Sequence, residues 1–260
     1  MYTSSFFDIL PLWALYITSA GIVLLSIELG WRIGNYRHQH VEKDINQPIS
    51  ATVGATLGLL AFLLAFTFGM AANRYDTRKQ IVIEEANAIG TTYLRVDFLP
   101  EQLRDQARDL LYEYTGLRAG GASSITSLQG ISKSASIQDR LWIVADDAKN
   151  ISDTVATGLF IQSLNEMIDL DTVRVAALRN RIPDSIWSML FIVTIFSMLA
   201  LGYEFGLTGT RNWVVTLLLM IVFTAVLVLI ADLDRPQVGW VQVSQQPLLD
   251  LLNKIGTPTP

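Results

Sequence analysis

The chain contains no cysteine, only two histidines and little charge. The lack of cysteine excludes disulfide bonds, thiolate metal ligands and cysteine nucleophiles. Charged residues make up 17% of the 260 residues, whereas soluble domains average about 25%. The formal net charge is only −5, which argues against a surface that binds nucleic acid. His38 and His40 lie in a polar stretch with Glu42 and Asp44. Two histidines on a polar loop are a weak metal signal, so we predict no metal site and no cofactor.

Enzyme signatures are also missing. The sequence has no Walker loop, no Gly-x-Gly-x-x-Gly, no His-Glu-x-x-His and no Gly-x-Ser-x-Gly. We therefore expect no catalytic site. What the chain has instead is apolar sequence: 51% of its residues are hydrophobic, and its mean hydropathy is +0.37. Long uncharged segments of this kind are typical of an integral membrane protein.

Four segments are long and apolar enough to cross a bilayer: residues 9–31, 51–72, 185–205 and 213–231. The sequence between the second and the third is polar but keeps helical periodicity. The fold class predicted is therefore an all-α membrane protein. It has four transmembrane helices and a helical cytoplasmic domain inserted between the second and the third.

This organisation divides the chain at three boundaries. We expect the first two transmembrane helices in residues 1–72, the cytoplasmic domain in 73–184, the third and fourth transmembrane helices in 185–231 and a cytoplasmic tail in 232–260. Inside the cytoplasmic domain, residues 116–136 are rich in glycine and serine and predict a mobile loop. Helices are expected on both sides of this loop, with a break at 150–153. The tail has one short amphipathic pattern, at 247–252.

The second apolar segment organises the rest of the chain. No ionisable residue occurs from Ala51 to Ala72, a run of about 22 residues that would span about 30 Å as a helix. The helical period then continues into charged sequence, because Val82, Ala86 and Ile89 keep steps of four and three. This predicts one long helix that crosses the membrane and continues into water. Several such helices around an axis would form a pore.

Glu28 lies in the last turn of the first segment, four residues before Arg32. Two interpretations stay open. The pair is either an interfacial ion pair on one helix face, or Glu28 is a functional carboxylate within the membrane.

Basic residues near the membrane ends favour one orientation. Seven lie on the side of the middle domain: Arg74, Arg78, Lys79, Arg174, Arg179, Arg181 and Arg235. Four lie on the other side: Arg32, Arg37, Lys43 and Arg211. Since cytoplasmic loops carry the excess of Lys and Arg, we expect a cytoplasmic middle domain and both termini in the cytoplasm.

Three stretches resemble a known family. They are residues 60–78, which end in Asn73-Arg-Tyr-Asp-Thr-Arg78, then Glu84-Glu-Ala-Asn-Ala-Ile-Gly90, and Asp232-Leu-Asp-Arg-Pro236 with Gly239. Together with the order of helices, they resemble the prokaryotic bestrophin-like family, a domain of unknown function, and more distantly the bestrophin channels. The resemblance to the prokaryotic family covers almost the whole chain.

The resemblance implies a homopentameric ion channel in the prokaryotic inner membrane, with the second transmembrane helix lining the pore. Its partners would be other copies of the chain, the lipid bilayer and inorganic ions. Calcium-gated animal bestrophins carry a dense acidic clasp after the fourth helix, of which only Asp232 and Asp234 remain here. Calcium gating is therefore not implied. The family contains both anion and cation channels, so the selectivity stays open.

The pore neck of bestrophins is lined by apolar side chains about one turn apart. Here Gly58, Phe62 and Phe66 fall on one ridge of the second helix, and we expect them to form a hydrophobic neck that gates by dewetting. The alternative is packing. The phenylalanines would then face lipid or neighbouring helices, and Gly54 with Gly58 would let two helices approach closely.

Polar residues further along this helix are expected at the cytoplasmic mouth or vestibule: Asn73, Arg74, Asp76, Arg78, Glu84 and Glu85. One of the two glutamates would face inward and form an acidic ring by symmetry. The alternative is a solvated or ion-paired helix face. After the fourth helix, we expect Asp232, Asp234 and Arg235 to form an ion-pair network that locks this helix onto the cytoplasmic bundle.

A second class of function stays open beside the channel. The chain would then be a non-conducting membrane scaffold or sensor, whose helical cytoplasmic domain responds to a partner. A pore requires an oligomer whose second helices line a continuous path, whereas a scaffold would bury these helices without water.

Overall fold

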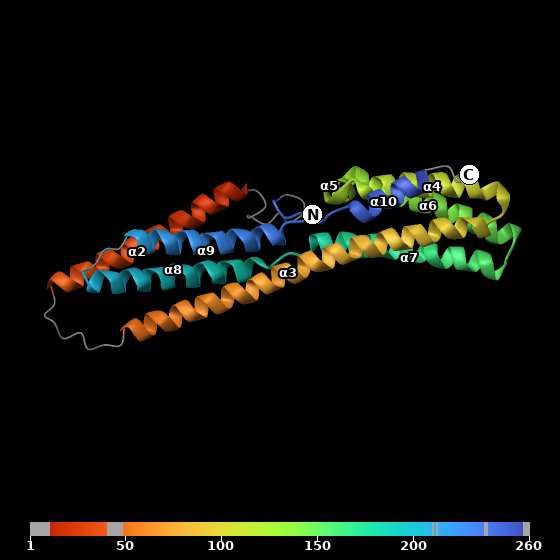
Figure 1. Cartoon of the computed structure of the whole chain (residues 1–260). Helices are drawn as coiled ribbons and strands as arrows, with labels where there is room; N and C mark the ends of the chain where they lie inside the picture. Colours follow the sequence, from red (N-terminus) through yellow and green to blue (C-terminus); the bar gives the residue numbers. More distant parts are fainter. Residues whose placement is uncertain (1–10, 41–48, 210, 212, 237–238, 257–260) are drawn as a thin grey trace. The chain divides into compact units, whose positions relative to one another are not determined.

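A computed structural model describes residues 11–40, 49–209, 211, 213–236 and 239–256, and the regular structure in these ranges is entirely helical (Figure 1). Its helices are Leu12–His40 (α2), Ile49–Arg95 (α3), the 3₁₀ turn Val96–Phe98 (η1), Glu101–Ala119 (α4), Gly121–Thr126 (α5), Leu128–Ile151 (α6), Val155–Arg179 (α7), Asp184–Leu207 (α8), Trp213–Asp234 (α9) and Gln246–Gly256 (α10). The all-α class is confirmed, and so is the single long helix that was expected to continue beyond the apolar run.

Several helix ends follow from local sequence chemistry. Pro100 and Pro183 immediately precede α4 and α8, which proline favours because its fixed φ suits a helix start. Ser127 caps α6, since its hydroxyl accepts a hydrogen bond from the Gly130 amide at 2.9 Å. The break expected at 150–153 is confirmed between α6 and α7.

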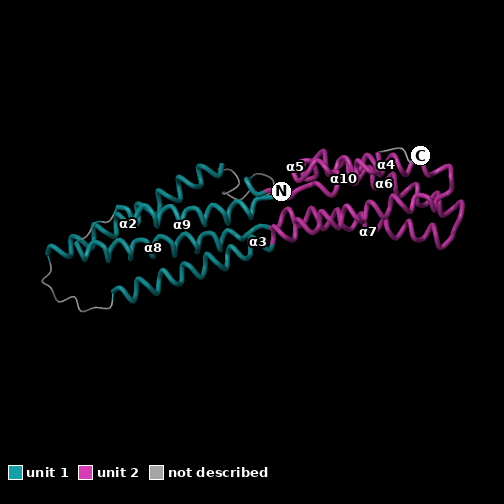
Figure 2. The backbone as a smooth tube through the Cα atoms, in the orientation of Figure 1, with its two compact units in different colours: residues 1–73, 181–241 teal, residues 74–180, 242–260 magenta. Residues whose placement is uncertain are grey.

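The chain forms two compact units, coloured separately in Figure 2. Unit 1 comprises residues 1–73 and 181–241, and unit 2 comprises residues 74–180 and 242–260. The corresponding boundaries expected from the sequence lie after residues 72 and 184. The segment 232–260, expected as one tail, is instead divided, because residues 242–260 group with unit 2.

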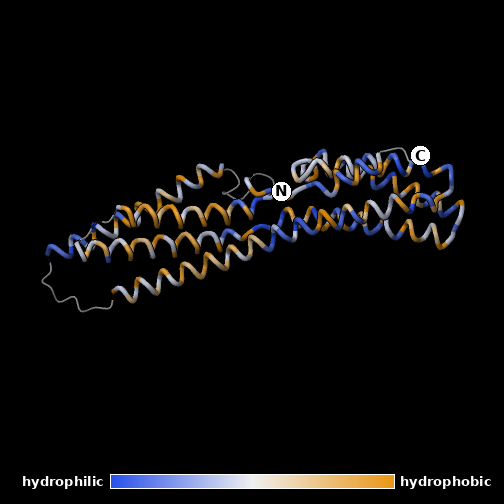
Figure 3. Tube along the Cα trace, viewed as in Figure 1, coloured by the Kyte–Doolittle hydropathy of each residue, from blue (hydrophilic) through white to orange (hydrophobic). Residues whose placement is uncertain are grey.

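Unit 1 holds the apolar helical segments, which stand out in the hydropathy colouring of Figure 3. Among the described residues, four helical segments are long and apolar enough to cross a membrane, in α2, α3, α8 and α9, which confirms the expected number. Two of these helices, α2 and α8, touch through four glycines. A Cβ on Gly30 would lie 2.0 Å from the Leu199 carbonyl oxygen, and one on Gly202 would lie 2.1 Å from that of Ile27. Gly34 and Gly206 are equally close to opposing backbone, so this crossing requires residues without side chains.

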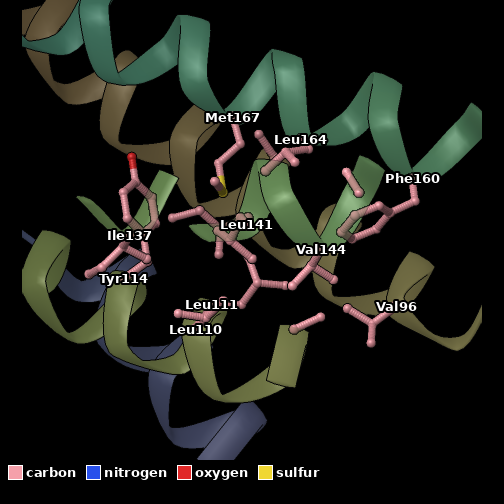
Figure 4. Close-up of a cluster of buried hydrophobic side chains, with 14 of the residues drawn as sticks. Val96, Leu110, Leu111, Tyr114, Ile137, Leu141, Val144, Phe160, Leu164 and Met167 are labelled. Carbon is pink, nitrogen blue, oxygen red and sulfur yellow. The ribbon is translucent and has the colours of Figure 1, made fainter. Parts of the chain in front are cut away.

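Unit 2 is a helical bundle with its own hydrophobic core (Figure 4). Many of its fully buried side chains come from α4, α6 and α7, among them Leu110, Leu111, Leu141, Val144, Phe160 and Leu164. Ile89 of α3 and Val96 of η1 are fully buried in the same core. The amphipathic helix expected near the C-terminus is confirmed as α10, whose Leu248 is buried in this core.

The mobile loop expected at 116–136 is wrong, because this segment is mostly helix: the end of α4, all of α5 and the start of α6. Ile125, within this segment, is almost fully buried. Two of its glycines are needed for backbone conformation and close packing. Gly121 has a φ of +80°, and a Cβ on Gly130 would lie 1.7 Å from the Ser124 carbonyl oxygen.

Candidate functional site

The membrane-spanning half of α3 has one buried stripe and one open face. Its buried residues recur at helical spacing: Val53, Leu60, Leu64, Thr67 and Ala71. Near this stripe, the Ser197 hydroxyl of α8 donates a hydrogen bond to the Thr56 carbonyl at 3.2 Å. Most of the other side chains of this segment are exposed.

The three neck candidates lie on the open face of α3. Phe62 is 65% exposed and Phe66 is 58% exposed, and their rings are stacked with centroids 6.5 Å apart. A Cβ on Gly58 or Gly54 would meet no atom of the described residues within 4 Å. Among the described residues, this glycine pair therefore makes no close helix contact, in contrast to the glycines of α2 and α8.

The open face of α3 differs from the exposed face of α9. The exposed side chains of α9 are large and aliphatic: Val214, Leu217, Leu218, Ile221 and Val222. This composition suits contact with lipid tails. The corresponding part of α3 instead exposes mostly small residues, such as Gly54 and Gly58, together with Leu59, before Phe62 and Phe66. Small residues are typical of surfaces where membrane helices meet other protein.

The residues expected at the mouth of the pore differ in how exposed their side chains are. Asn73 and Asp76 are exposed, Arg74 is half-buried and Arg78 is buried. Glu84 is exposed on α3, beside Asn87, Glu166 and Asp169. Glu85 was expected to line the mouth or vestibule of the pore. Its side chain is instead fully buried inside unit 2.

Glu85 is the centre of a buried charge cluster. Its Oε1 accepts a hydrogen bond from Arg118 Nε at 2.5 Å, and its Oε2 forms an ion pair with Arg174. Arg118 also pairs with Asp171, whose other oxygen accepts from the Gln138 amide at 2.8 Å. Two arginines and two carboxylates thus neutralise one another, which is how buried charge is tolerated.

The buried charge cluster connects distant parts of unit 2. Arg174 on α7 donates to the Gln245 side-chain oxygen at 2.5 Å, just before α10 begins. Tyr114 lies beside Arg118, and burial is the main cause that raises its pKa above the ordinary value. The cluster therefore joins α3, α4 and α7 to the segment that leads into α10.

Sequence reasoning missed Arg118, Asp171 and Arg174 as partners of Glu85. One signal was present. Glu85 lies three residues after Val82 and four before Ile89, on the apolar seam itself. A carboxylate at a seam position needs buried cationic partners, although sequence spacing does not say which arginines supply them.

The acidic residues at the end of α9 form a network within unit 1. Asp234 accepts from the Arg181 guanidinium at 3.1 Å and from the Ile182 amide at 3.0 Å. Asp232 accepts from the backbone amides of Trp240 and Val241, at 2.9 and 3.1 Å. Asp232, Asp234 and Arg235 are all buried. The two carboxylates fix the chain before α8 and the chain after α9.

Glu28 has two cationic partners at its end of unit 1. The expected pair with Arg32 is present at 2.9 Å, and Arg211 approaches the second carboxylate oxygen at 2.7 Å. The other weak candidate, a metal at His38 and His40, depended on Glu42 and Asp44, which lie outside the described residues.

Comparison with known proteins identifies the fold and then the family. The crystal structure of a bacterial bestrophin homolog from Klebsiella pneumoniae, carrying one mutation, superposes with a TM-score of 0.64 at 16% sequence identity. The match covers 90% of this chain and 94% of that chain. The family model described as Bestrophin-like domain matches residues 20–248, so the chain belongs to the bestrophin-like family. No curated protein matches the chain.

Proposed function

We propose that the chain forms an oligomeric ion channel, a homopentamer whose pore is lined by α3. The observation that carries this proposal is the open face of α3, which exposes Gly58, Phe62 and Phe66 while the opposite stripe is buried. A chain with four membrane helices cannot enclose a water-filled path by itself. Copies related by symmetry would bring the open faces of α3 together around an axis.

Phe62 and Phe66 form the neck of this pore. Phenylalanine rings offer no hydrogen bonds to replace the hydration of an ion, so a narrow ring of them favours loss of water and raises a barrier to ions. Below the neck, Asn73, Asp76 and Glu84 line the mouth and vestibule, since all three are exposed on α3. Glu85 is not part of this lining, because Arg118 and Arg174 occupy its carboxylate.

The channel lies in the prokaryotic inner membrane, with unit 2 and both termini in the cytoplasm. Support for this orientation comes from the seven basic residues on the side of the middle domain against four on the other side.

The neck is tested by truncating both rings, Phe62→Ala and Phe66→Ala together, and measuring current in planar bilayers with purified protein. Wider, less apolar walls should raise the conductance or the open probability. The matched control is Phe196→Ala on α8, since Phe196 is also 65% exposed and loses the same atoms. It should leave the current unchanged.

Thermal unfolding of the same proteins separates gate from packing. Phe→Ala in a buried core lowers the free energy of unfolding by about 3–5 kcal/mol. The same substitution should lower it by less where the ring faces a pore. Absence of current in every protein, with a core-type loss of stability in the double variant, would contradict the channel and favour a scaffold.

A further inference from the structure

Unit 1 contains a cavity of about 330 Å³ that the proposed pore does not use. It lies between α2, α8 and the start of α9, and most of its lining is apolar: Leu24, Leu25, Ile27, Phe205 and Trp213. The polar part of the lining includes Glu28, Arg32 and Arg211. The cavity therefore combines an apolar interior with charged groups at one place.

Arg211 is held in a fixed position in this lining. Its guanidinium lies 4.6 Å from the ring centroid of Trp31 and 4.1 Å from that of Trp213, and it pairs with Glu28 at 2.7 Å. Cation–π contacts on two sides orient a guanidinium without consuming its outward N–H groups. More than a third of the Arg211 side chain stays exposed, so it can receive a further anionic partner.

The charge of the cavity favours an anion. Arg32 and Arg211 share the single carboxylate of Glu28, at 2.9 and 2.7 Å. These three side chains therefore carry a net charge of +1. A ligand with one negative charge would complete the balance, whereas an additional ammonium group would be repelled.

The cavity also lies where the membrane helices end. α8 ends at Leu207 and the apolar α9 begins at Trp213, and tryptophans concentrate at the boundary between hydrocarbon and headgroups. Leu25, on the apolar side of the lining, is exposed. We propose that this cavity binds an anionic phospholipid, with its phosphate on Arg211 and Arg32 and the start of an acyl chain along the apolar lining.

The test compares unfolding midpoints of purified protein in mild detergent after addition of phosphatidylglycerol, phosphatidylcholine or glycerol 3-phosphate. Phosphatidylglycerol should raise the midpoint by about 3 °C more than phosphatidylcholine does. Glycerol 3-phosphate should give no shift, because it cannot use the apolar lining. Equal shifts with both lipids would overturn the proposal, and so would a full shift with glycerol 3-phosphate, which would assign the site to a soluble phosphate.

Three variants locate the effect. Arg211→Gln removes the phosphate contact, and Leu25→Trp fills the apolar part while it keeps both arginines. Both should abolish the difference between the two lipids within the same variant, whatever their own midpoints. The control is Arg37→Gln, which makes the same charge change on α2 outside the cavity, where Arg37 donates to the Tyr203 hydroxyl. It should keep the difference.

Two further results would overturn the assignment. If Arg37→Gln abolishes the lipid difference as Arg211→Gln does, the effect is general surface charge. If Leu25→Trp changes the mass of the oligomer and the lipids have no effect in any protein, the cavity is a contact between copies of the chain.

Discussion

Glu84 and Glu85 are neighbours in the sequence with opposite surroundings. Glu84 is exposed, whereas Glu85 is fully buried between Arg118 and Arg174. A buried charge that loses its counter-charge keeps the desolvation cost without the compensating attraction. A neutral replacement of Glu85 therefore leaves uncompensated positive charge inside unit 2.

Glu85→Gln should destabilise the protein by about 3–5 kcal/mol. The adjacent control, Glu84→Gln, should stay within about 0.5 kcal/mol of the unmodified protein, as exposed substitutions usually do. Thermal or denaturant unfolding of both purified proteins measures the difference. Equal midpoints for the two variants would show that the buried charge cluster contributes nothing to stability.

At the scale of a helix, the contact between α2 and α8 depends on residues without side chains. Gly30→Ala would place a methyl group 2.0 Å from the Leu199 carbonyl oxygen, so α8 must move. We expect a loss of about 1–3 kcal/mol in the free energy of unfolding, the usual cost of overpacking.

Gly21→Ala is the control within the same helix, since a Cβ on Gly21 would meet no atom of the described residues within 4 Å. It should be neutral or slightly stabilising, because alanine favours the helix more than glycine does. Both variants can be compared by unfolding in the same detergent. If Gly30→Ala is as well tolerated as Gly21→Ala, the close approach of α2 and α8 is wrong.

Sequence periodicity predicted the helices well because it depends on residues close together in the chain. The four apolar segments, the long α3 and the short α10 all followed from local patterns. Contacts between helices were harder to predict from the sequence. The spacing of Gly54 and Gly58 is the same as that of Gly30 and Gly34, and only the position of α8 shows which pair meets a neighbour.

The prediction of a mobile loop at 116–136 was wrong for a related reason. Glycine and serine there suggested mobility, but Gly130 is needed because Ser124 lies against it, a contact that becomes visible only when α5 folds back on α6. For the candidate site, the sequence pointed to Phe62 and Phe66 as neck candidates, and both are exposed, but it did not point to the partners of Glu85. Those partners lie 33 residues away at Arg118 and 89 residues away at Arg174.

For the whole molecule, the proposed channel function requires a closed ring of chains. Native mass spectrometry in mild detergent should show a complex of about 145 kDa, five times the chain mass of 28.9 kDa. The neck variant Phe62→Ala with Phe66→Ala should keep the same mass if its rings face an axis instead of a subunit contact. A stable monomer would end the channel interpretation.

The orientation can be tested cleanly because the chain has no cysteine. In the proposed topology, single cysteines at Gln39 and Ser123 would report on opposite sides of the membrane, and both positions are exposed. In intact cells, an impermeant thiol reagent should label the first and not the second. The reverse pattern would invert the topology.

The division of unit 2 into two distant stretches sets an order of events during synthesis. Its residues 74–180 leave the ribosome before α8 and α9 have been made, but Gln245 and the buried Leu248 come after them. Until then the nascent bundle lacks the side-chain oxygen that Arg174 needs and exposes the surface that α10 will cover. Unit 2 therefore completes its folding only after α8 and α9 have been synthesised.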